Sequence, residues 1–183
     1  MPIICMKWYP YSNYSTSILY YAHVNGYIGI FDKESKRKSI IIGENDEIAC
    51  IDFNKDSSLM ASVGKDYTIK LYDSNLNNSS TFNTIVKTFG ISNVDNYVNQ
   101  SLQPSISATS FQTSLSTSST HTNRLQSVKF SNSSNDVLFT GGWDRTVKMW
   151  DVREPYGIVN TIYGPFICGS DAMDVNVSNK III

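Results

Sequence analysis

The sequence predicts an all-β protein built from a repeated unit of short antiparallel strands. Short segments rich in Ile, Val, Tyr and Phe alternate with clusters of Asn, Gly, Asp and Ser, which is typical of many short strands joined by turns. We find no sustained apolar stripe with the spacing of a helix. Three similar segments, GYIGIFD, DYTIKLYD and DRTVKMWD, end at Asp32, Asp73 and Asp151, which indicates a repeat.

Individual strands are expected wherever an apolar segment is bounded by turn residues. In chain order these segments are IICMKW, SILYYAHV, YIGIFD, KSIIIG, EIACIDF, LMASVG, TIKLYD, RLQSVKF, DVLFTGG and TVKMWD. The segment FNTIVKTF adds a strand after Asp73, and GIVNTIYG and AMDVNVSNKIII begin another unit towards the end of the chain.

The spacing of the repeat matches one blade of a β-propeller. Asp32 and Asp73 are 41 residues apart, inside the period of about 40–45 residues of a four-stranded blade. Asp73 and Asp151 are 78 residues apart, 37 more than one period. The surplus lies between about Ser74 and Ser119, most of it in a Ser-, Thr- and Asn-rich tract at 91–119. Because this tract has few apolar residues to offset its ordering entropy, we predict a long disordered insertion.

These boundaries predict one incomplete propeller of about three to four blades over residues 1–183. Its units are 1–35 (a partial first blade), 36–75, 76–153 (a third blade that includes the insertion) and 154–183 (the start of a fourth). Propellers have about 4–8 blades. We therefore expect the remaining blades to come from further sequence or from another chain.

The third unit, His121 to Arg153, reads HTNRLQSVKFSNSSNDVLFTGGWDRTVKMWDVR and resembles the WD-repeat family. The family pattern is a Gly-His pair, a variable core and a closing Trp-Asp. Here His121 takes the His place, with Thr120 where Gly is usual, and Trp150 begins the closing pair. The resemblance implies a buried polar network within the blade. Its members would be His121, Thr140, Asp144 and Trp150.

The first two units depart from this pattern while keeping its turns. In the second unit Glu44 stands where His is expected, Ser62 and Asp66 match, and Tyr72 replaces Trp. In the first unit Asn25-Gly26 supplies the turn, and Asn-Gly is a strong hairpin signal. The resemblance therefore implies that the sheets persist where the polar network does not.

The His, Asp and hydroxyl of the third unit invite comparison with a hydrolase triad. We interpret them as structural, because the hydroxyl would be held inside the blade and nothing resembles an oxyanion hole. A catalytic Cys168 would need a His partner, and only His23 and His121 exist. No ligand cluster has metal-site spacing. We therefore predict a protein that is not an enzyme, with no cofactor and no metal.

Partner-binding residues are expected on the face that carries the turn between the two middle strands of each blade. Loops on a rigid scaffold can vary without unfolding it. The candidates on this face are Lys65, Tyr67, Arg124, Trp143 and Arg145. An exposed Trp beside an Arg has the composition of a binding hot spot. The structural alternative is that Trp143 packs on a neighbouring blade or on Arg145.

The closing segment Trp150-Asp151-Val152-Arg153 suggests a second interaction site. It looks like the motif by which some WD-repeat proteins dock on the adaptor of a cullin–RING ubiquitin ligase, which makes Asp151 and Arg153 candidate docking residues. The alternative is an ordinary blade ending in which the Arg pairs with a nearby carboxylate.

Composition narrows the function classes. The net charge is −1, and the one basic run, Lys36-Arg37-Lys38, is short, so we expect no direct contact with nucleic acid. Three cysteines without a CxxC pair favour reduced thiols in the cytoplasm or nucleus, and no segment predicts a signal peptide or membrane span. We predict a protein–protein interaction scaffold within a multi-protein complex, binding proteins or peptides. The alternatives are a ligase substrate receptor and a chromatin- or RNA-associated propeller.

Overall fold

The structure is a computed structural model of the 183-residue chain. It describes residues 2–10, 17–43, 46–75, 83–90, 120–176, 178 and 180–183. The predicted insertion at 91–119 and the side chain of Glu44 lie outside the described residues.

The described residues form three four-stranded antiparallel sheets and one two-stranded sheet. The first sheet holds β1 (Ile3–Trp8), β2 (Ile18–His23), β3 (Tyr27–Asp32) and β4 (Lys38–Gly43). The second holds β5 (Ile48–Phe53), β6 (Leu59–Gly64), β7 (Ile69–Asp73) and β8 (Ile85–Phe89). The third holds β9 (Leu125–Phe130), β10 (Val137–Gly142), β11 (Thr146–Asp151) and β12 (Ile158–Tyr163). The last pair is β13 (Asp174–Val175) with β14 (Ile181–Ile182).

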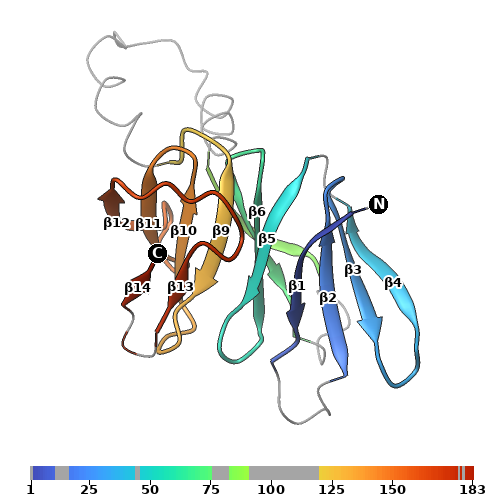
Figure 1. Ribbon diagram of the computed structural model, residues 1–183. Coiled ribbons are helices and arrows are strands. Elements are labelled where there is room, and N and C mark those ends of the chain that lie inside the picture. The colour runs from blue at the N-terminus through green and yellow to red at the C-terminus, as the bar shows by residue number, and fades with distance from the viewer. Residues whose placement is uncertain are drawn as a thin grey trace, which may run out of the picture.

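The sheets stand beside one another like the blades of a propeller (Figure 1). Each four-stranded sheet is a meander in which neighbours in sequence are neighbours in space. The first strand of one sheet adjoins the first strand of the next, so β5 lies against both β1 and β9. This is the all-β architecture of antiparallel blades that the sequence predicts.

The core lies between the sheets. The second sheet is flanked on both sides, and most residues of β5 and β6 are buried accordingly. Three buried aromatic residues, Tyr9, Tyr20 and Phe53, pack between the first two sheets. The rings of Tyr20 and Phe53 lie edge to face with centroids 4.8 Å apart. None of the described residues forms a helix with the length and apolarity to cross a membrane.

Each sheet includes one strand beyond the sequence unit that supplies its first three strands. The predicted unit boundaries at 35/36, 75/76 and 153/154 fall between the third and fourth strands of the three sheets. The closing Asp of a unit ends the third strand of a sheet, as Asp73 ends β7. The unit seen in sequence and the sheet seen in space are therefore offset by one strand.

Candidate functional site

The turns between the second and third strands of the sheets share one backbone design. Gly26, Tyr67 and Arg145 occupy the same place in the three turns and have φ angles of 84°, 65° and 59°. A non-Gly residue in this left-handed region is sterically strained. A hydrogen bond to the preceding Asp compensates for this strain: Asp66 Oδ1 and Asp144 Oδ1 each accept the backbone N–H two residues later at 3.1 Å.

In the third sheet the turn carboxylate belongs to a buried chain of polar side chains. Asp144 Oδ2 lies 2.7 Å from His121 Nδ1, and His121 Nε2 lies 2.7 Å from Thr140 Oγ1. Trp150 Nε1–H donates to Thr140 Oγ1, also at 2.7 Å. The structure thus brings together the four residues that the family resemblance implied. Thr146, which sequence reasoning missed, donates its hydroxyl to Asp144 Oδ1 at 2.9 Å.

One proton assignment gives every atom of this network a partner. The indole N–H can only donate, so Thr140 Oγ1 accepts from Trp150 and donates its own hydrogen to His121 Nε2. His121 Nδ1–H then donates to Asp144, and the imidazole is neutral. Burial lowers the pKa of His121 despite the neighbouring carboxylate. Burial alone would raise the pKa of Asp144, but hydrogen bonds, led by that from His121, hold it at about 2.

This geometry suits a structural lock rather than catalysis. His121 and Thr140 are 1% and 0% exposed, so the hydroxyl that a triad would use as nucleophile is closed off from any substrate. Both hydrogen-bonding sites of the imidazole are occupied. A fully partnered buried network stabilises one arrangement of the strands that carry it.

The second sheet holds its turn with a different partner. Asp66 Oδ2 lies 2.6 Å from Lys70 Nζ and also accepts the Thr68 hydroxyl at 2.8 Å. Lys70 therefore pairs with the turn carboxylate of the second sheet, whereas neutral His121 hydrogen-bonds to it in the third. Ser62 is buried in β6, the strand before the turn.

At the end of the sheets that carries these turns, two exposed aromatic rings and a partly buried arginine form a platform. Trp143 is 41% exposed and Phe166 is 53% exposed. Their rings are stacked with centroids 6.2 Å apart and an interplanar angle of 25°. The Arg124 guanidinium carbon lies 4.7 Å from the centre of the Trp143 ring. The cation against Trp143 is thus Arg124, whereas the alternative interpretation from sequence placed Arg145 there. We call Arg124, Trp143 and Phe166 the aromatic platform.

Backbone hydrogen bonds fix the aromatic platform from three sides. Trp143 N–H donates to the carbonyl of Arg124 at 3.0 Å, and Ile167 N–H donates to Gly142 at 3.4 Å. Gly164 N–H donates to Arg145 at 2.9 Å. A Cβ at Gly142 would lie 2.3 Å from the Arg124 carbonyl oxygen, so the close approach of these segments requires glycine.

Two further cations lie on the turns at this end of the sheets. Arg145 is exposed in the turn after Trp143, and Lys65 is exposed at the equivalent turn of the second sheet, beside half-buried Tyr67. The two carboxylates nearest in sequence, Asp66 and Asp144, are engaged within their own sheets. Neither Lys65, Arg124 nor Arg145 forms an ion pair with another described residue.

The other predicted interaction residues, Asp151 and Arg153, pair with each other. Arg153 Nε donates to Asp151 Oδ1 at 2.9 Å and its terminal nitrogen to Oδ2 at 2.6 Å. A second carboxylate, Asp136, lies 3.7 Å from Arg153 Nε. The guanidinium remains 68% exposed, but its fork is directed at the carboxylate two residues before it.

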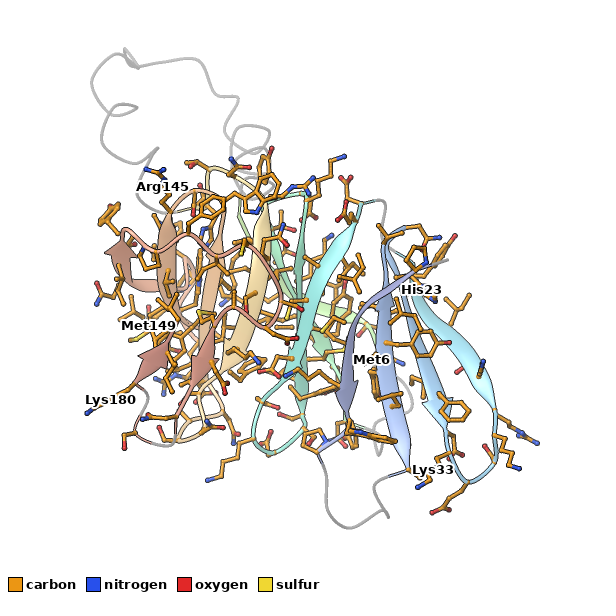
Figure 2. All side chains as sticks on the ribbon, viewed as in Figure 1. Met6, His23, Lys33, Arg145, Met149 and Lys180 are labelled. Carbon is orange, nitrogen blue, oxygen red and sulfur yellow. The ribbon has the colours of Figure 1, made fainter. Side chains whose placement is uncertain are left out.

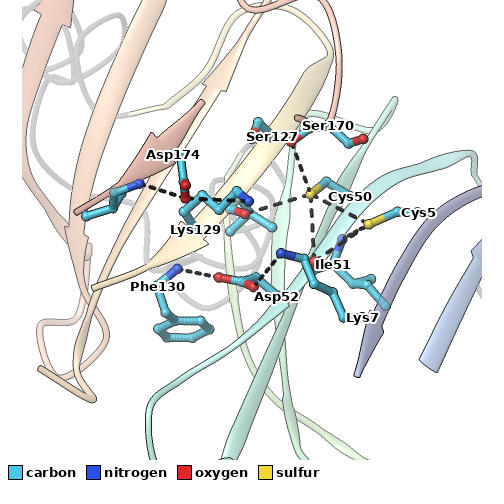
Figure 3. A network of polar contacts seen from close by, with 12 residues as sticks. Cys5, Lys7, Cys50, Ile51, Asp52, Ser127, Lys129, Phe130, Ser170 and Asp174 are labelled. Carbon is cyan, nitrogen blue, oxygen red and sulfur yellow. Dashed lines mark hydrogen bonds and ion pairs between the residues drawn. The ribbon is translucent and has the colours of Figure 1, made fainter. Parts of the chain in front are cut away.

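A second polar network joins the innermost strands of neighbouring sheets (Figure 3). Asp52 on β5 accepts the backbone N–H of Phe130 on β9 at 2.8 Å and lies 3.3 Å from Lys7 Nζ on β1. Lys129 on β9 lies 3.8 Å from Asp174 on β13. Charge therefore alternates from sheet to sheet at matching positions.

The two cysteines of the inner strands contact each other. Cys5 and Cys50 are buried on β1 and β5 with their Sγ atoms 4.0 Å apart, while Cys168 is exposed. Within the described part of the chain, no three His, Cys, Asp or Glu side chains gather as a metal site would require.

An apolar groove of about 470 Å³ lies on the first sheet. Residues of β2 alternate between its two faces: Tyr20 and Ala22 are buried, while Leu19, Tyr21 and His23 line the groove. Its lining is mostly apolar, and its described residues include His23 and Lys38 but no carboxylate.

Comparisons with known proteins agree with this architecture. A family model described as "WD domain, G-beta repeat" (WD40) matches residues 35–73 and 112–151. The chain is 31% identical over 139 residues to "Protein tipD" of Dictyostelium discoideum, an alignment that covers 70% of this chain and 22% of tipD. The chain therefore spans well under two thirds of that relative.

Solved WD40 structures share the fold. The "Crystal structure of RRP9 WD40 repeats" superposes with a TM-score of 0.61 at 20% identity, covering 88% of this chain and 38% of that one. The "Structure of U3-55K" gives the same TM-score, identity and coverage of this chain, and 39% of its own.

Proposed function

Since this chain carries WD40 repeats and folds as adjoining propeller blades, we propose that it is a non-enzymatic interaction module that holds another protein within a multi-protein complex. The aromatic platform and the cations around it are the binding face. The observation that carries the proposal is Trp143, a large aromatic side chain that stays 41% exposed while its backbone is held by the Arg124 carbonyl. Exposed aromatic and Arg side chains on rigid scaffolds are typical of binding hot spots.

Preorganisation supports this choice of face. Ordering flexible side chains and loops opposes association. Here the three segments that present Arg124, Trp143 and Phe166 are already joined by backbone hydrogen bonds. A partner would meet a fixed surface and would have little ordering to complete.

Affinity purification of the tagged full chain from cells that encode it tests the proposal. Proteins recovered with the wild type should be depleted with the double variant Trp143→Ala/Arg145→Ala. The matched control is Trp8→Ala/Lys33→Ala, which removes an exposed Trp and an exposed cation elsewhere on the molecule. Equal recovery with both double variants would refute the binding face.

The structure offers less support for the two predicted alternatives, docking on a ligase adaptor and association with nucleic acid. Docking on a ligase adaptor requires an available Arg153, and the bidentate pair with Asp151 already accounts for that side chain. Pull-down of the adaptor by wild type but not by Arg153→Ala would establish this role. A nucleic-acid role calls for an extended basic surface, whereas the chain has a net charge of −1.

A further inference from the structure

We propose that the aromatic platform recognises an acidic peptide in which an aromatic side chain is flanked by carboxylates. This inference rests on the proposed function and names the chemistry of its partner. The aromatic anchor would extend the stack of Trp143 and Phe166, and the carboxylates would pair with the cations that border it.

The first argument is the composition of the platform. Trp143 and Phe166 are already stacked, yet together they leave large exposed ring surfaces. A further aromatic ring gains both apolar burial and favourable ring geometry at such a place.

The second argument is charge. Arg124 lies against the Trp143 ring, Arg145 follows one residue after Asp144, and Lys65 occupies the neighbouring turn. The nearby carboxylates Asp66 and Asp144 are engaged by Lys70 and His121. Glu47 adjoins Lys65 through a backbone hydrogen bond, but no described carboxylate forms an ion pair with Lys65, Arg124 or Arg145, so carboxylates on a ligand would find unpaired cations here.

The third argument is the strained position of Arg145. Its φ of 59° would suit glycine better, as the equivalent Gly26 of the first sheet shows. A side chain retained at a strained backbone position often has a functional role. Figure 2 shows Arg145 projecting at the opposite end of the sheets from Lys33. The turn thus displays a guanidinium beside the platform at a conformational cost.

Fluorescence titration of the full chain tests this inference directly. In a Trp8→Phe background, the remaining tryptophans are exposed Trp143 and buried Trp150, so a ligand on the platform changes the emission of Trp143. The probe is a pool of dodecapeptides with a fixed Asp-Phe-Glu core. Matched pools carry Lys-Phe-Lys, Asp-Ala-Glu or phosphoserine-Phe-phosphoserine, and an oligouridylate serves as the nucleic-acid probe.

We expect saturable binding of the Asp-Phe-Glu pool that weakens at least about tenfold when either the aromatic or the acidic residues of the core are replaced. Anisotropy of the labelled pool should show a similar loss for Trp143→Ala and a smaller one for Arg145→Ala. Arg145→Glu, a change at an exposed position, should abolish binding. Lys33→Ala, which removes the same charge at the other end of the sheets, should bind like wild type.

Each other outcome overturns the inference. Tighter binding of the phosphoserine pool or of oligouridylate would assign the platform to a phosphorylated peptide or to nucleic acid instead. Failure of every pool, with capture in cells still dependent on Trp143, would refute the acidic–aromatic class and leave the proposed function standing. Independence of capture from Trp143 would refute both.

Discussion

Thr140 is the residue on which the buried network of the third sheet depends. Its hydroxyl accepts from Trp150 Nε1 and bonds His121 Nε2, both at 2.7 Å. Replacing it by the isosteric Val would keep the packing but leave the buried Trp150 Nε1–H and His121 Nε2 without a hydrogen-bond partner. We expect Thr140→Val to lower the free energy of unfolding by about 2–3 kcal/mol.

Urea unfolding measured by Trp fluorescence checks this prediction. Thr122→Val is the matched control, because Thr122 is exposed and contributes only its backbone N–H to Asp144. A loss no larger for Thr140→Val than for the control would show that the network adds nothing to stability.

His121 gives the network a pH dependence whose sign follows from its lowered pKa. The unfolded imidazole takes up a proton near pH 6.5, while the folded one stays neutral to lower pH. Stability is therefore present above pH 6.5 and is lost as the pH falls below it, by up to about 1.4 kcal/mol per pH unit. Asp144, with a pKa of about 2, begins to cost stability only below the unfolded value of 3.8.

Unfolding free energies between pH 7 and pH 5 test this prediction when wild type is compared with His121→Gln. The comparison is needed because burial raises the pKa of Asp52, and protonation of that carboxylate changes stability in the opposite direction. The variant should be less stable at pH 7 and should lose less stability on acidification. Parallel pH profiles for the two proteins would contradict the assignment of a neutral buried imidazole.

At the scale of elements, Arg145 in the turn between β10 and β11 is expected to contribute to binding but not to the stability of the fold. Arg145→Gly removes a side chain from a left-handed position, which relieves roughly 1–2 kcal/mol of strain, while the flexibility of glycine in the unfolded chain returns about 0.5–1 kcal/mol. We expect unchanged or slightly higher thermal stability together with weaker binding of the acidic peptide pool. Arg145→Ala should lose binding without the gain in stability. A clearly destabilised Arg145→Gly would mean that the arginine side chain supports the fold.

The elements also show what the sequence alone reveals. Strands such as β7 and β11 were predictable because each is a short apolar segment bounded by turn residues. Their place in a particular sheet was not, because the repeat ends at the closing Asp whereas the sheet continues by one strand. The insertion at 91–119 stays a prediction, since it lies outside the described residues.

The candidate site also contains residues that the sequence predicts and residues that only the structure reveals. The four network residues follow a spacing that the family pattern makes visible. Phe166 joins Trp143 through the path of the loop between β12 and β13, which no local pattern encodes. Lys70 was hidden because it reaches Asp66 from four residues further along the chain, whereas His121 reaches Asp144 from the loop before β9. Residues that follow the family spacing are therefore found in sequence, whereas a residue brought in by a loop or one that replaces the usual partner is not.

For the whole molecule, cohesion depends on contacts between the innermost strands of successive sheets. Lys7 on β1 pairs with Asp52 on β5, and Asp52 also holds the backbone of β9. The side chains of Lys7 and Asp52 are 28% and 16% exposed, so solvent screens the pair only in part. Lys7→Met would keep most of the packing and remove the cation paired with the poorly solvated Asp52 carboxylate, leaving Lys129 as the charge that still lowers its pKa.

We expect Lys7→Met to destabilise the protein by about 1–3 kcal/mol near neutral pH, with the effect discounted for partial exposure. Removing the cation raises the pKa of Asp52 further, because burial already favours its neutral form. The deficit relative to wild type should therefore shrink as the pH falls and Asp52 takes up its proton. Lys33→Met, at an exposed turn, should show neither effect. Unfolding free energies of the three proteins from pH 7 to pH 4 decide the matter, since a deficit independent of pH would mean that Lys7 acts through packing rather than through its charge.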